Sequence, residues 1–204
     1  MGRVAGVGRV GRVGRMGDLR IVTMAWPDLP PELRAQIEAL QEQAWPGGGP
    51  HDPALGPVAV LLLAPDGGVR AALDILSKEI IHRGRSYRAS GLSAVVTDVA
   101  HRGKGYGRRL VAAARELIAD GGAVDVGLFT CDRPLQAFYE SAGWTALPGT
   151  VLVGGTPQDP FPSDRPGFDK VTMAAFFTAR AQRDAAAFES SRIGLYPGEV
   201  DRLW

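Results

Sequence analysis

The sequence predicts an α/β (α+β) fold, with a mixed, mostly antiparallel sheet, helices on both faces and a central βαβ unit. Three observations support this prediction. Two short apolar runs meet at Asp66-Gly67-Gly68, a turn sequence typical of antiparallel hairpins. A glycine-rich loop joins a hydrophobic strand to an amphipathic helix over 105–120. Another strand follows this helix, and strands joined by such a crossover pair in parallel.

The first half of the chain predicts a strand, a helix and an antiparallel meander. Residues 19–25 form a short apolar run, and a helix is expected over 33–44, where apolar residues recur at helical spacing. Strands are expected over 58–63, 69–75 and 87–97, with turns between them.

The second half predicts the βαβ unit and a weaker C-terminal pattern. After the 105–120 helix, a strand is expected over 124–129 and a short helix from the capping residue Asp132 to the exit at Gly143. Further along, the pattern favours strands over 151–153 and 170–177 and a helix over 179–191.

Length and composition favour one domain over residues 18–204, because a chain of 204 residues that is 45% hydrophobic can bury one full core. Residues 1–17 repeat Gly-Arg-Val with four arginines and no acid, which predicts a disordered basic tail. A basic tail can contact nucleic acid or acidic membranes. No aromatic residue is interleaved with the arginines, so we favour a flexible tail, or a true start at Met16 or another codon, and expect neither partner.

The single cysteine and the apolar runs indicate a cytoplasmic protein. Cys131 cannot form an internal disulfide, which suits a reducing compartment. We expect it to be a small hydrophobe at the end of a strand rather than a catalytic thiol. The longest apolar run, 58–64, is too short to cross a bilayer, and no secretory signal is visible. The oligomeric state stays open, a homodimer included.

The loop before the 105–120 helix predicts a phosphate or pyrophosphate site. Glycines at 103, 105 and 107 remove the Cβ atoms, so an anion can approach the main chain closely. The first N–H groups of a helix lack intrahelical partners, and the helix dipole is positive there. Four cationic side chains lie among these glycines: Arg102, Lys104, Arg108 and Arg109.

Two other phosphate-binding loops do not fit. A P-loop needs a Ser or Thr after its Gly-Lys pair, whereas Gly105 follows Gly103-Lys104. A dinucleotide fingerprint needs G-x-G-x-x-G and an acid at the end of the next strand, whereas the spacing here is G-x-G-x-G and Asp125 lies near the start of its strand. A plain tight turn would not explain the four cations beside the helix.

The loop resembles the signature of the GNAT acetyltransferase superfamily. Arg102-x-x-Gly105-x-Gly107, entered from Val95-Val96-Thr97, is similar to its first motif. Ala137 to Trp144, with Tyr139 followed by Gly143-Trp144, is similar to its second. The resemblance covers about residues 18–145 and implies the GNAT fold, with acetyl-CoA as co-substrate and no metal.

The resemblance also implies roles for individual residues. An amine would attack acetyl-CoA directly, and Tyr139 would donate a proton to the departing thiolate. A core tyrosine is the alternative for Tyr139. The cofactor would contact the backbone of the strand end and the loop, namely Val95, Val96, Thr97, Arg102, Gly103, Lys104, Gly105, Tyr106, Gly107 and Arg108.

The general base is not assigned by the sequence. GNAT enzymes often carry a glutamate on the strand before the loop, but Ser93 stands at the expected position and is assigned to the acceptor side. Asp98 is favoured as a turn or cap residue. Glu79 and His82 lie on or near the preceding strand and could equally be solvated edge residues. Water, or a base from the C-terminal segment, remains an alternative.

Two segments resemble the aminoglycoside 2'-N-acetyltransferases. These are 80–85 and the acidic ending 197–204, closed by Trp204. The resemblance implies that 146–204 forms the acceptor side, where carboxylates attract ammonium groups and an aromatic ring stacks on a sugar. Ser93, Glu199, Asp201 and Trp204 would line the acceptor site, with Asp52 beside them.

Three alternatives to an aminosugar acceptor stay open. The acceptor could be a protein or peptide amine, or the amine of another small metabolite. The absence of the strand glutamate also allows a catalytically degenerate module that only binds acyl-CoA. For Trp204, the alternative role is a C-terminal aromatic packed into the core.

Overall fold

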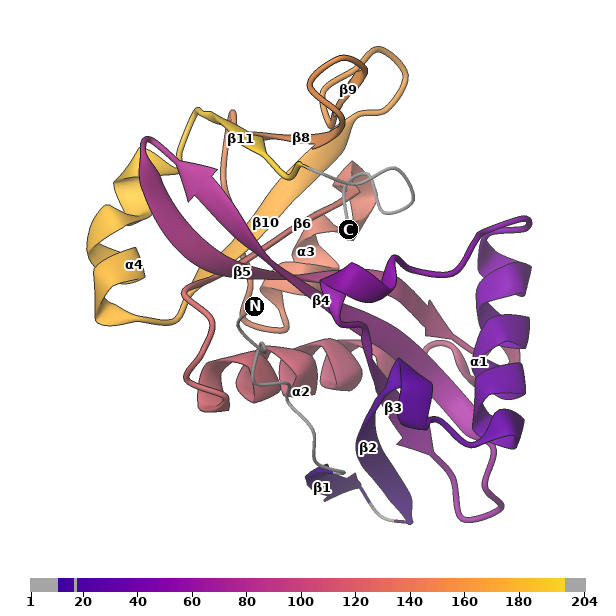
Figure 1. Cartoon of the computed structure of the whole chain (residues 1–204). Coiled ribbons are helices and arrows are strands. Elements are labelled where there is room, and N and C mark those ends of the chain that lie inside the picture. Colours follow the sequence, from indigo (N-terminus) through magenta and orange to yellow (C-terminus); the bar gives the residue numbers. More distant parts are fainter. Residues whose placement is uncertain (1–10, 17, 197–204) are drawn as a thin grey trace.

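The computed structural model describes residues 11–16 and 18–196. Its main sheet has eight strands in the order β1-β2-β3-β4-β5-β6-β10-β7 (Figure 1). Among the described residues of this sheet, β5 and β6 are the only neighbouring strands that pair in parallel. The predicted mixed, mostly antiparallel α/β fold is therefore confirmed. The strands are β1 (Gly11–Met16), β2 (Leu19–Ala25), β3 (Val58–Leu63), β4 (Val69–His82), β5 (Arg85–Thr97), β6 (Val126–Asp132), β7 (Thr145–Ala146) and β10 (Lys170–Phe176).

The helices lie on both faces of this sheet, as predicted. They are α1 (Pro31–Ala44), α2 (Tyr106–Asp120), α3 (Gln136–Glu140) and α4 (Ala179–Asp184). Alternation along β3 directs successive side chains to opposite faces. Val60 and Leu62 pack with the apolar face of α2, whereas Leu61 packs with Ile37 of α1. No described helix is long and apolar enough to span a membrane.

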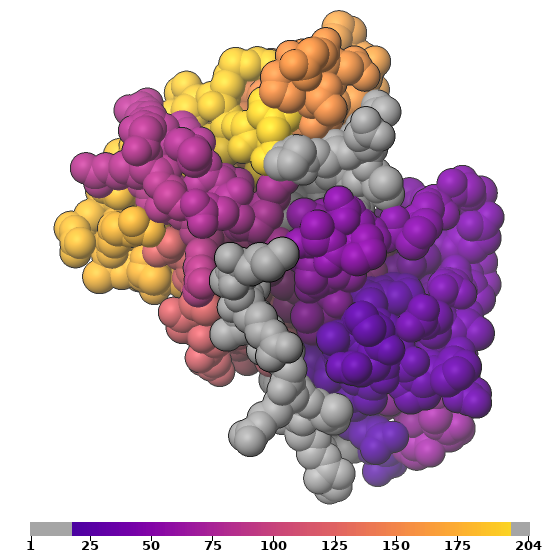
Figure 2. Space-filling view, in the orientation of Figure 1, coloured from indigo at the N-terminus to yellow at the C-terminus, as the bar shows by residue number. Residues whose placement is uncertain are grey.

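A second, smaller sheet packs beside the β4–β5 hairpin. It has the order β11-β8-β9, formed by β11 (Arg192–Gly194), β8 (Val151–Gly155) and β9 (Pro160–Pro162). Its core joins Ile80 and Tyr87 of the hairpin to Phe188 and to β8. In Figure 2 the magenta hairpin tip lies against the yellow C-terminal segments, away from the purple surface of α1.

Several predicted boundaries need correction. Gly11–Met16, within the stretch expected to be disordered, pair with β2, since an edge strand offers unpaired N–H and C=O groups. The helix expected over 179–191 stops at Asp184, followed by one 3₁₀ turn and β11. Ser190 has a φ of 47°, which an α-helix cannot contain. The strand after Ala123 begins at Val126 rather than 124, and the helix after Asp132 shortens to α3.

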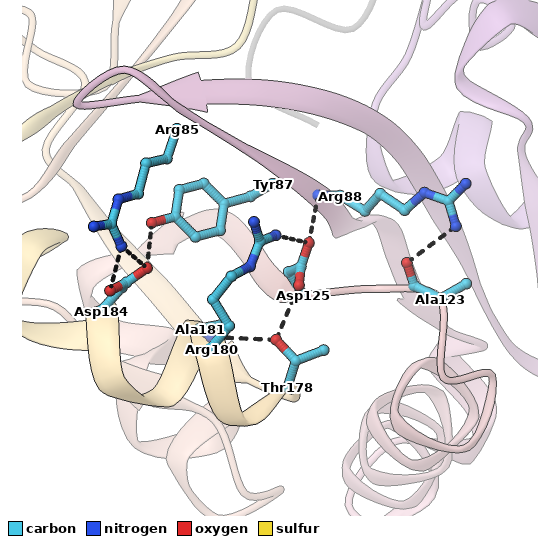
Figure 3. A network of polar contacts seen from close by, with 9 residues as sticks. All are labelled: Arg85, Tyr87, Arg88, Ala123, Asp125, Thr178, Arg180, Ala181 and Asp184. Atoms are coloured by element: carbon cyan, nitrogen blue, oxygen red, sulfur yellow. Dashed lines mark hydrogen bonds and ion pairs between the residues drawn. The ribbon is translucent and has the colours of Figure 1, made fainter.

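A polar network ties α4 to the hairpin and to the start of β6 (Figure 3). Asp184 accepts from Arg85 at 3.0 Å and from the Tyr87 hydroxyl at 2.8 Å. Asp125 accepts from the backbone N–H of Arg88 at 3.0 Å, from Thr178 at 2.9 Å and from Arg180 at 2.7 Å. The contacts link segments that are far apart in sequence.

The network predicts a loss of stability in acid. Partial burial raises the pKa of Asp125, but the Arg88 N–H, Thr178 and Arg180 more than offset it, so the pKa is lowered. The Tyr87 hydroxyl and Arg85 lower the pKa of Asp184. A carboxyl with a lowered folded-state pKa stabilises the fold above its unfolded value of about 3.9, and this stabilisation is lost as the pH falls through the folded value.

We expect Asp125→Asn to lower the free energy of unfolding by about 1–2 kcal/mol at pH 6, because a hydrogen-bonded charge is removed. The further loss between pH 6 and about pH 3 should be smaller in the variant than in the wild type. Thermal unfolding at a series of pH values measures both. Asp120→Asn, at the exposed end of α2, is the control and should keep the wild-type slope. Equal slopes for Asp125→Asn and the wild type would contradict the assignment.

Candidate active site

The glycine loop takes backbone conformations that require glycine. Gly103 and Gly105 have φ values of 78° and 75°, and Gly105 is the N-cap of α2. A Cβ on Gly107 would lie 3.0 Å from Thr97 Oγ1 and 3.4 Å from the Phe138 ring, so only glycine lets α2 pack this closely on the end of β5. The loop therefore presents the first N–H groups of a 15-residue helix at the strand end.

The cations predicted for the loop surround it. Arg102, Lys104, Arg108 and Arg109 are all exposed. Arg102 also donates from Nε to the Thr97 carbonyl at 3.3 Å, which fixes the start of the loop on β5. The arrangement fits a pyrophosphate, because exposed cations and unpaired N–H groups converge at the positive end of the helix dipole.

Asp98 has the turn role that was predicted. Its carboxylate accepts from Ala100 N at 3.1 Å and contacts His101 Nδ1 at 2.7 Å. The hydrogen bond from His101 lowers the pKa of Asp98, which keeps the carboxylate charged and bound to the turn. These contacts occupy Asp98 in shaping the loop.

Beyond the loop, β5 and β6 part from each other. Their parallel ladder consists of Ala89↔Val126 and Ser90↔Gly127, although both strands continue. A cleft of about 1430 Å³ opens where they separate, lined by 92–95 of β5 and 130–132 of β6. Within the part of the chain that the structure describes, β5 therefore has a backbone edge that is not paired with β6, and this edge faces the cleft.

A β-bulge shapes this edge. The β4–β5 register runs from Ala72↔Val96 to Asp74↔Ser93, so β5 holds one extra residue. Ala94, inside the bulge, has a φ of 49°, an uncommon value for a residue with a Cβ. Bulges re-aim side chains beside active sites, and here Ser93, Ala94 and Val95 all line the cleft in succession.

Tyr139 of α3 lies in the wall of the same cleft. It is 6% exposed, and its ring packs 4.9 Å from those of Phe129 and Phe138. Trp144 packs 4.8 Å from Phe129, so the Gly-Trp pair of the second motif supports this cluster. Burial raises the pKa of Tyr139, so the phenol is protonated at neutral pH. Among the described residues its hydroxyl has no hydrogen-bond partner.

Cys131 also lines the cleft and belongs to the main core. Burial raises the pKa of its thiol to about 11, so little thiolate exists at neutral pH. The prediction of a small buried hydrophobe at the end of a strand is confirmed.

The sequence did not predict the rest of the lining. It comes from Phe161 and Phe168, which pack on the second core cluster, and from Trp26, α1 and residues within 45–57. Behind this last part, buried Asp74 accepts from Trp26 Nε1 at 2.6 Å and Gln41 Nε2 at 2.8 Å, with His51 Nε2 at 3.0 Å. The available signal was an aspartate between the apolar residues Leu73 and Ile75 of a strand.

The structure brings some predicted residues together and separates others. Ser93 and Val95 line the cleft, whereas the Val96 side chain packs under α1. Glu199, Asp201 and Trp204 lie outside the described residues. Three further residues have local structural contacts: Asp52 caps a 3₁₀ turn through Ala54 N, Glu79 pairs in the hairpin with Arg88, and His82 contacts the Ala187 carbonyl.

Comparison with known proteins agrees with this geometry. Residues 70–146 match the family model of the acetyltransferase (GNAT) domain. No curated protein sequence matches. The fold is similar to that of an acyl-CoA N-acyltransferase from Pseudomonas aeruginosa, which is 18% identical, with a TM-score of 0.55 over 76% of this chain and 98% of that chain.

Two further structures share the fold. Escherichia coli ElaA is 17% identical, with a TM-score of 0.55 over 76% of this chain and 98% of its own. A chain of the NatC complex bound to Gag peptide and CoA is 14% identical, with a TM-score of 0.52 over 78% and 99%. The fold is therefore the GNAT fold. Family match and fold together support an acetyl-CoA-dependent N-acetyltransferase.

Proposed function

We propose that this chain transfers an acetyl group from acetyl-CoA to a primary amine by direct attack. One observation carries the proposal: the glycine loop at the start of α2 follows β5, and residues 92–95 of the same strand line the cleft where β5 and β6 part. A ligand with a pyrophosphate at one end and an extended amide-containing arm fits such a path. It binds N–H groups at the loop and pairs with a free strand edge farther on.

The residues present fit this co-substrate. The loop from Arg102 to Gly107, with Arg108, would hold the pyrophosphate, and the backbone of Val95 to Thr97 would hold the arm. Acetyl-CoA supplies a thioester, whose carbonyl carbon accepts the amine and whose sulfur leaves as a thiolate. Tyr139 would donate its proton to that sulfur, because burial keeps its phenol protonated at the wall of the cleft.

The acceptor side favours a cationic amine. Glu38 and Glu42 of α1 line the cleft beside Trp45, whose side chain is 49% exposed. Carboxylates with an exposed aromatic ring attract ammonium groups. An aminosugar such as a 2'-amino aminoglycoside is one such acceptor, and the role of Glu199, Asp201 and Trp204 toward it stays a prediction from the sequence. A peptide amine or another metabolite amine uses the same chemistry.

Acetyl-CoA consumption, followed by free-thiol release against a panel of amines, tests the proposal. Turnover with a 2'-amino aminoglycoside, and none with its 2'-hydroxy counterpart, would support the aminosugar acceptor. Turnover only with peptides or other amines would retain the acetyltransferase and reject the aminosugar. Tight CoA binding without thiol release for any amine would reject the enzyme in favour of an acyl-CoA-binding module.

A further inference from the structure

Asp74 of β4 is a buried acid at a position where the core would accept an apolar residue. Its side chain is fully buried, and its neighbours Leu73 and Ile75 are buried apolar residues. Burying a carboxylate is costly unless it is hydrogen-bonded. Well-packed apolar residues often replace buried charges without loss of stability. The fold alone therefore does not require an acid here, and departures of this kind are expected at functional sites.

Three side chains from separate segments meet at Asp74, and all three line the cleft. Oδ1 accepts from Trp26 Nε1 at 2.6 Å, and Oδ2 accepts from Gln41 Nε2 of α1 at 2.8 Å. Oδ2 also lies 3.0 Å from His51 Nε2. Trp26, Gln41 and His51 are called the α1 wall below, because they line the cleft together with α1. One carboxyl group thus joins this whole wall to β4.

Trp26 is fixed from other sides as well. Arg34 donates to its carbonyl at 2.8 Å, and the Arg34 guanidinium lies 5.8 Å from the centre of its ring. The backbone N–H of Trp26 donates to the Pro57 carbonyl at 3.0 Å. With the backbone held in this way, the bond to Asp74 fixes the rotamer of the indole. A wall of fixed side chains binds a ligand without the entropic cost of ordering them.

The helix α1 is attached to the sheet without the help of Asp74. Ile37 is fully buried in the core between α1 and the sheet. Gln36 of the same helix accepts from the Val69 N–H at the start of β4 at 2.9 Å. The contacts of Asp74 therefore set the orientation of the α1 wall rather than the position of the helix.

The position of Asp74 relates this wall to the reaction. Asp74 lies directly across the β4–β5 ladder from Ser93, and the bulge beside this pair turns Ser93 and Ala94 into the cleft. The α1 wall is thus joined to the sheet at the rung where β5 enters the cleft. Under the proposed function, this is where the acceptor amine reaches the thioester.

We propose that Asp74 is the positioning residue for the acceptor amine and that it acts through Trp26 and Gln41. This inference depends on the proposed function. Asp74 itself touches neither the acceptor nor acetyl-CoA, and it takes no part in proton transfer. It holds the two side chains in the orientation that the bound acceptor meets. Correct orientation of the reacting amine is a large part of catalysis by proximity.

The first test separates acceptor binding from the chemical step and from cofactor binding. Asparagine at position 74 keeps one accepting oxygen and presents N–H donors on its other side, so it cannot satisfy both Trp26 and Gln41. Asp74→Asn should therefore raise the KM of the amine roughly tenfold, the usual effect of one lost hydrogen bond. The kcat and the Kd of acetyl-CoA should change much less. The probe is the 2'-amino aminoglycoside or, where it is not turned over, the amine of the panel with the fastest thiol release.

Gln36→Met is the matched control. It removes a hydrogen bond between α1 and β4 that lies outside the cleft lining. Its melting temperature should fall, whereas the KM of the amine should stay at the wild-type value. An equal rise of KM in Gln36→Met and Asp74→Asn would overturn the inference, because the rise would then report a loosened helix.

A double-mutant cycle tests whether Asp74 acts through Trp26. Trp26→Phe keeps an aromatic ring and removes the N–H donor. If the two residues act as a unit, Asp74→Asn should lower kcat/KM less in the Trp26→Phe background than in the wild type. Additive effects of the two substitutions would contradict the proposed route.

A further test needs no substrate or co-substrate. The chain has four tryptophans, and their indole N–H groups are followed by ¹H–¹⁵N NMR, with the Trp26 signal assigned by its loss in Trp26→Phe. In Asp74→Asn the Trp26 N–H should exchange with solvent roughly tenfold faster, because its acceptor is weakened. Trp144, whose Nε1 is buried without a partner among the described residues, should keep its exchange rate.

Thermal unfolding shows whether Asp74→Asn is folded. If it is not, Trp26→Phe and Gln41→Met replace it, and each should raise the KM of the amine while the Kd of acetyl-CoA stays unchanged. Wild-type turnover with an unchanged KM in these variants would overturn the inference and leave the acetyltransferase intact, as would an unchanged exchange rate of Trp26 in folded Asp74→Asn. Absence of wild-type turnover, with acetyl-CoA bound, would reject the proposed function and this inference with it.

Discussion

Gly105→Ala is expected to raise the Kd of acetyl-CoA by roughly 10²-fold, the equivalent of two charge-assisted hydrogen bonds. Gly105 has a φ of 75° and caps α2, and a Cβ there would meet no protein atom within 4 Å. The methyl group would therefore project into the space in front of the helix N-terminus. A pyrophosphate could no longer approach the main chain closely. Isothermal titration with CoA measures the loss.

Backbone strain alone could also weaken the loop, and Gly67→Ala controls for it. Gly67 lies in the β3–β4 turn with a φ of 81° and equally open space. A residue with a Cβ in this conformation costs about 1–2 kcal/mol at either position. Both variants should lose similar stability, but only Gly105→Ala should lose CoA affinity. Equal CoA affinities in the two variants would show that the loop does not bind the pyrophosphate.

The cofactor side could be predicted from sequence because its determinants are local. Glycines at fixed spacing, cations and a following amphipathic helix define a helix N-terminus within a few residues, and α2 begins at Tyr106, one residue after the expected start. The same holds for strands such as Leu19–Ala25 and Val58–Leu63, whose predicted bounds are those of β2 and β3. Periodicity and turn residues determine these elements without long-range contacts.

The acceptor side could not be predicted in this way, because it is assembled by tertiary contacts. Trp26 and Gln41 meet Asp74 across separations of 48 and 33 residues. The bulge that turns Ser93 into the cleft is a property of the β4–β5 pairing. The alanine at position 94 does not indicate a bulge in the sequence. The strand before the loop therefore carries Ser93 where an acid was expected, and the acid Asp74 lies opposite it on the neighbouring strand.

The predicted extent of the C-terminal helix was wrong for a related reason. Residues 179–191 have helical composition, but Phe188 is buried in the core beside the second sheet, and the chain turns at Ser190 to add β11 to β8. Tertiary packing of Phe188 against Tyr87 and His82 overrides the local preference. The polar network around Asp125 and Asp184 then holds what remains of the helix in place.

Tyr139→Phe is expected to lower kcat by roughly 10²- to 10³-fold with little change in the Kd of acetyl-CoA, since it removes the proton donor for the thiolate. Its melting temperature should hardly change, because the Tyr139 hydroxyl has no partner among the described residues and the ring contacts persist. Single-turnover thiol release separates the chemical step from product release.

Tyr87→Phe gives the opposite combination and makes the test specific. Tyr87 is also buried, but its hydroxyl donates to Asp184 at 2.8 Å and lies in the network outside the cleft. Removing it should lower the melting temperature and leave kcat unchanged, because only the packing of α4 on the hairpin is weakened.

If both variants kept full kcat, Tyr139 would be a core residue and the thiolate would take its proton from water. If both lost kcat in proportion to stability, the loss would report folding rather than acid catalysis. Only activity loss without stability loss at Tyr139 identifies the proton donor.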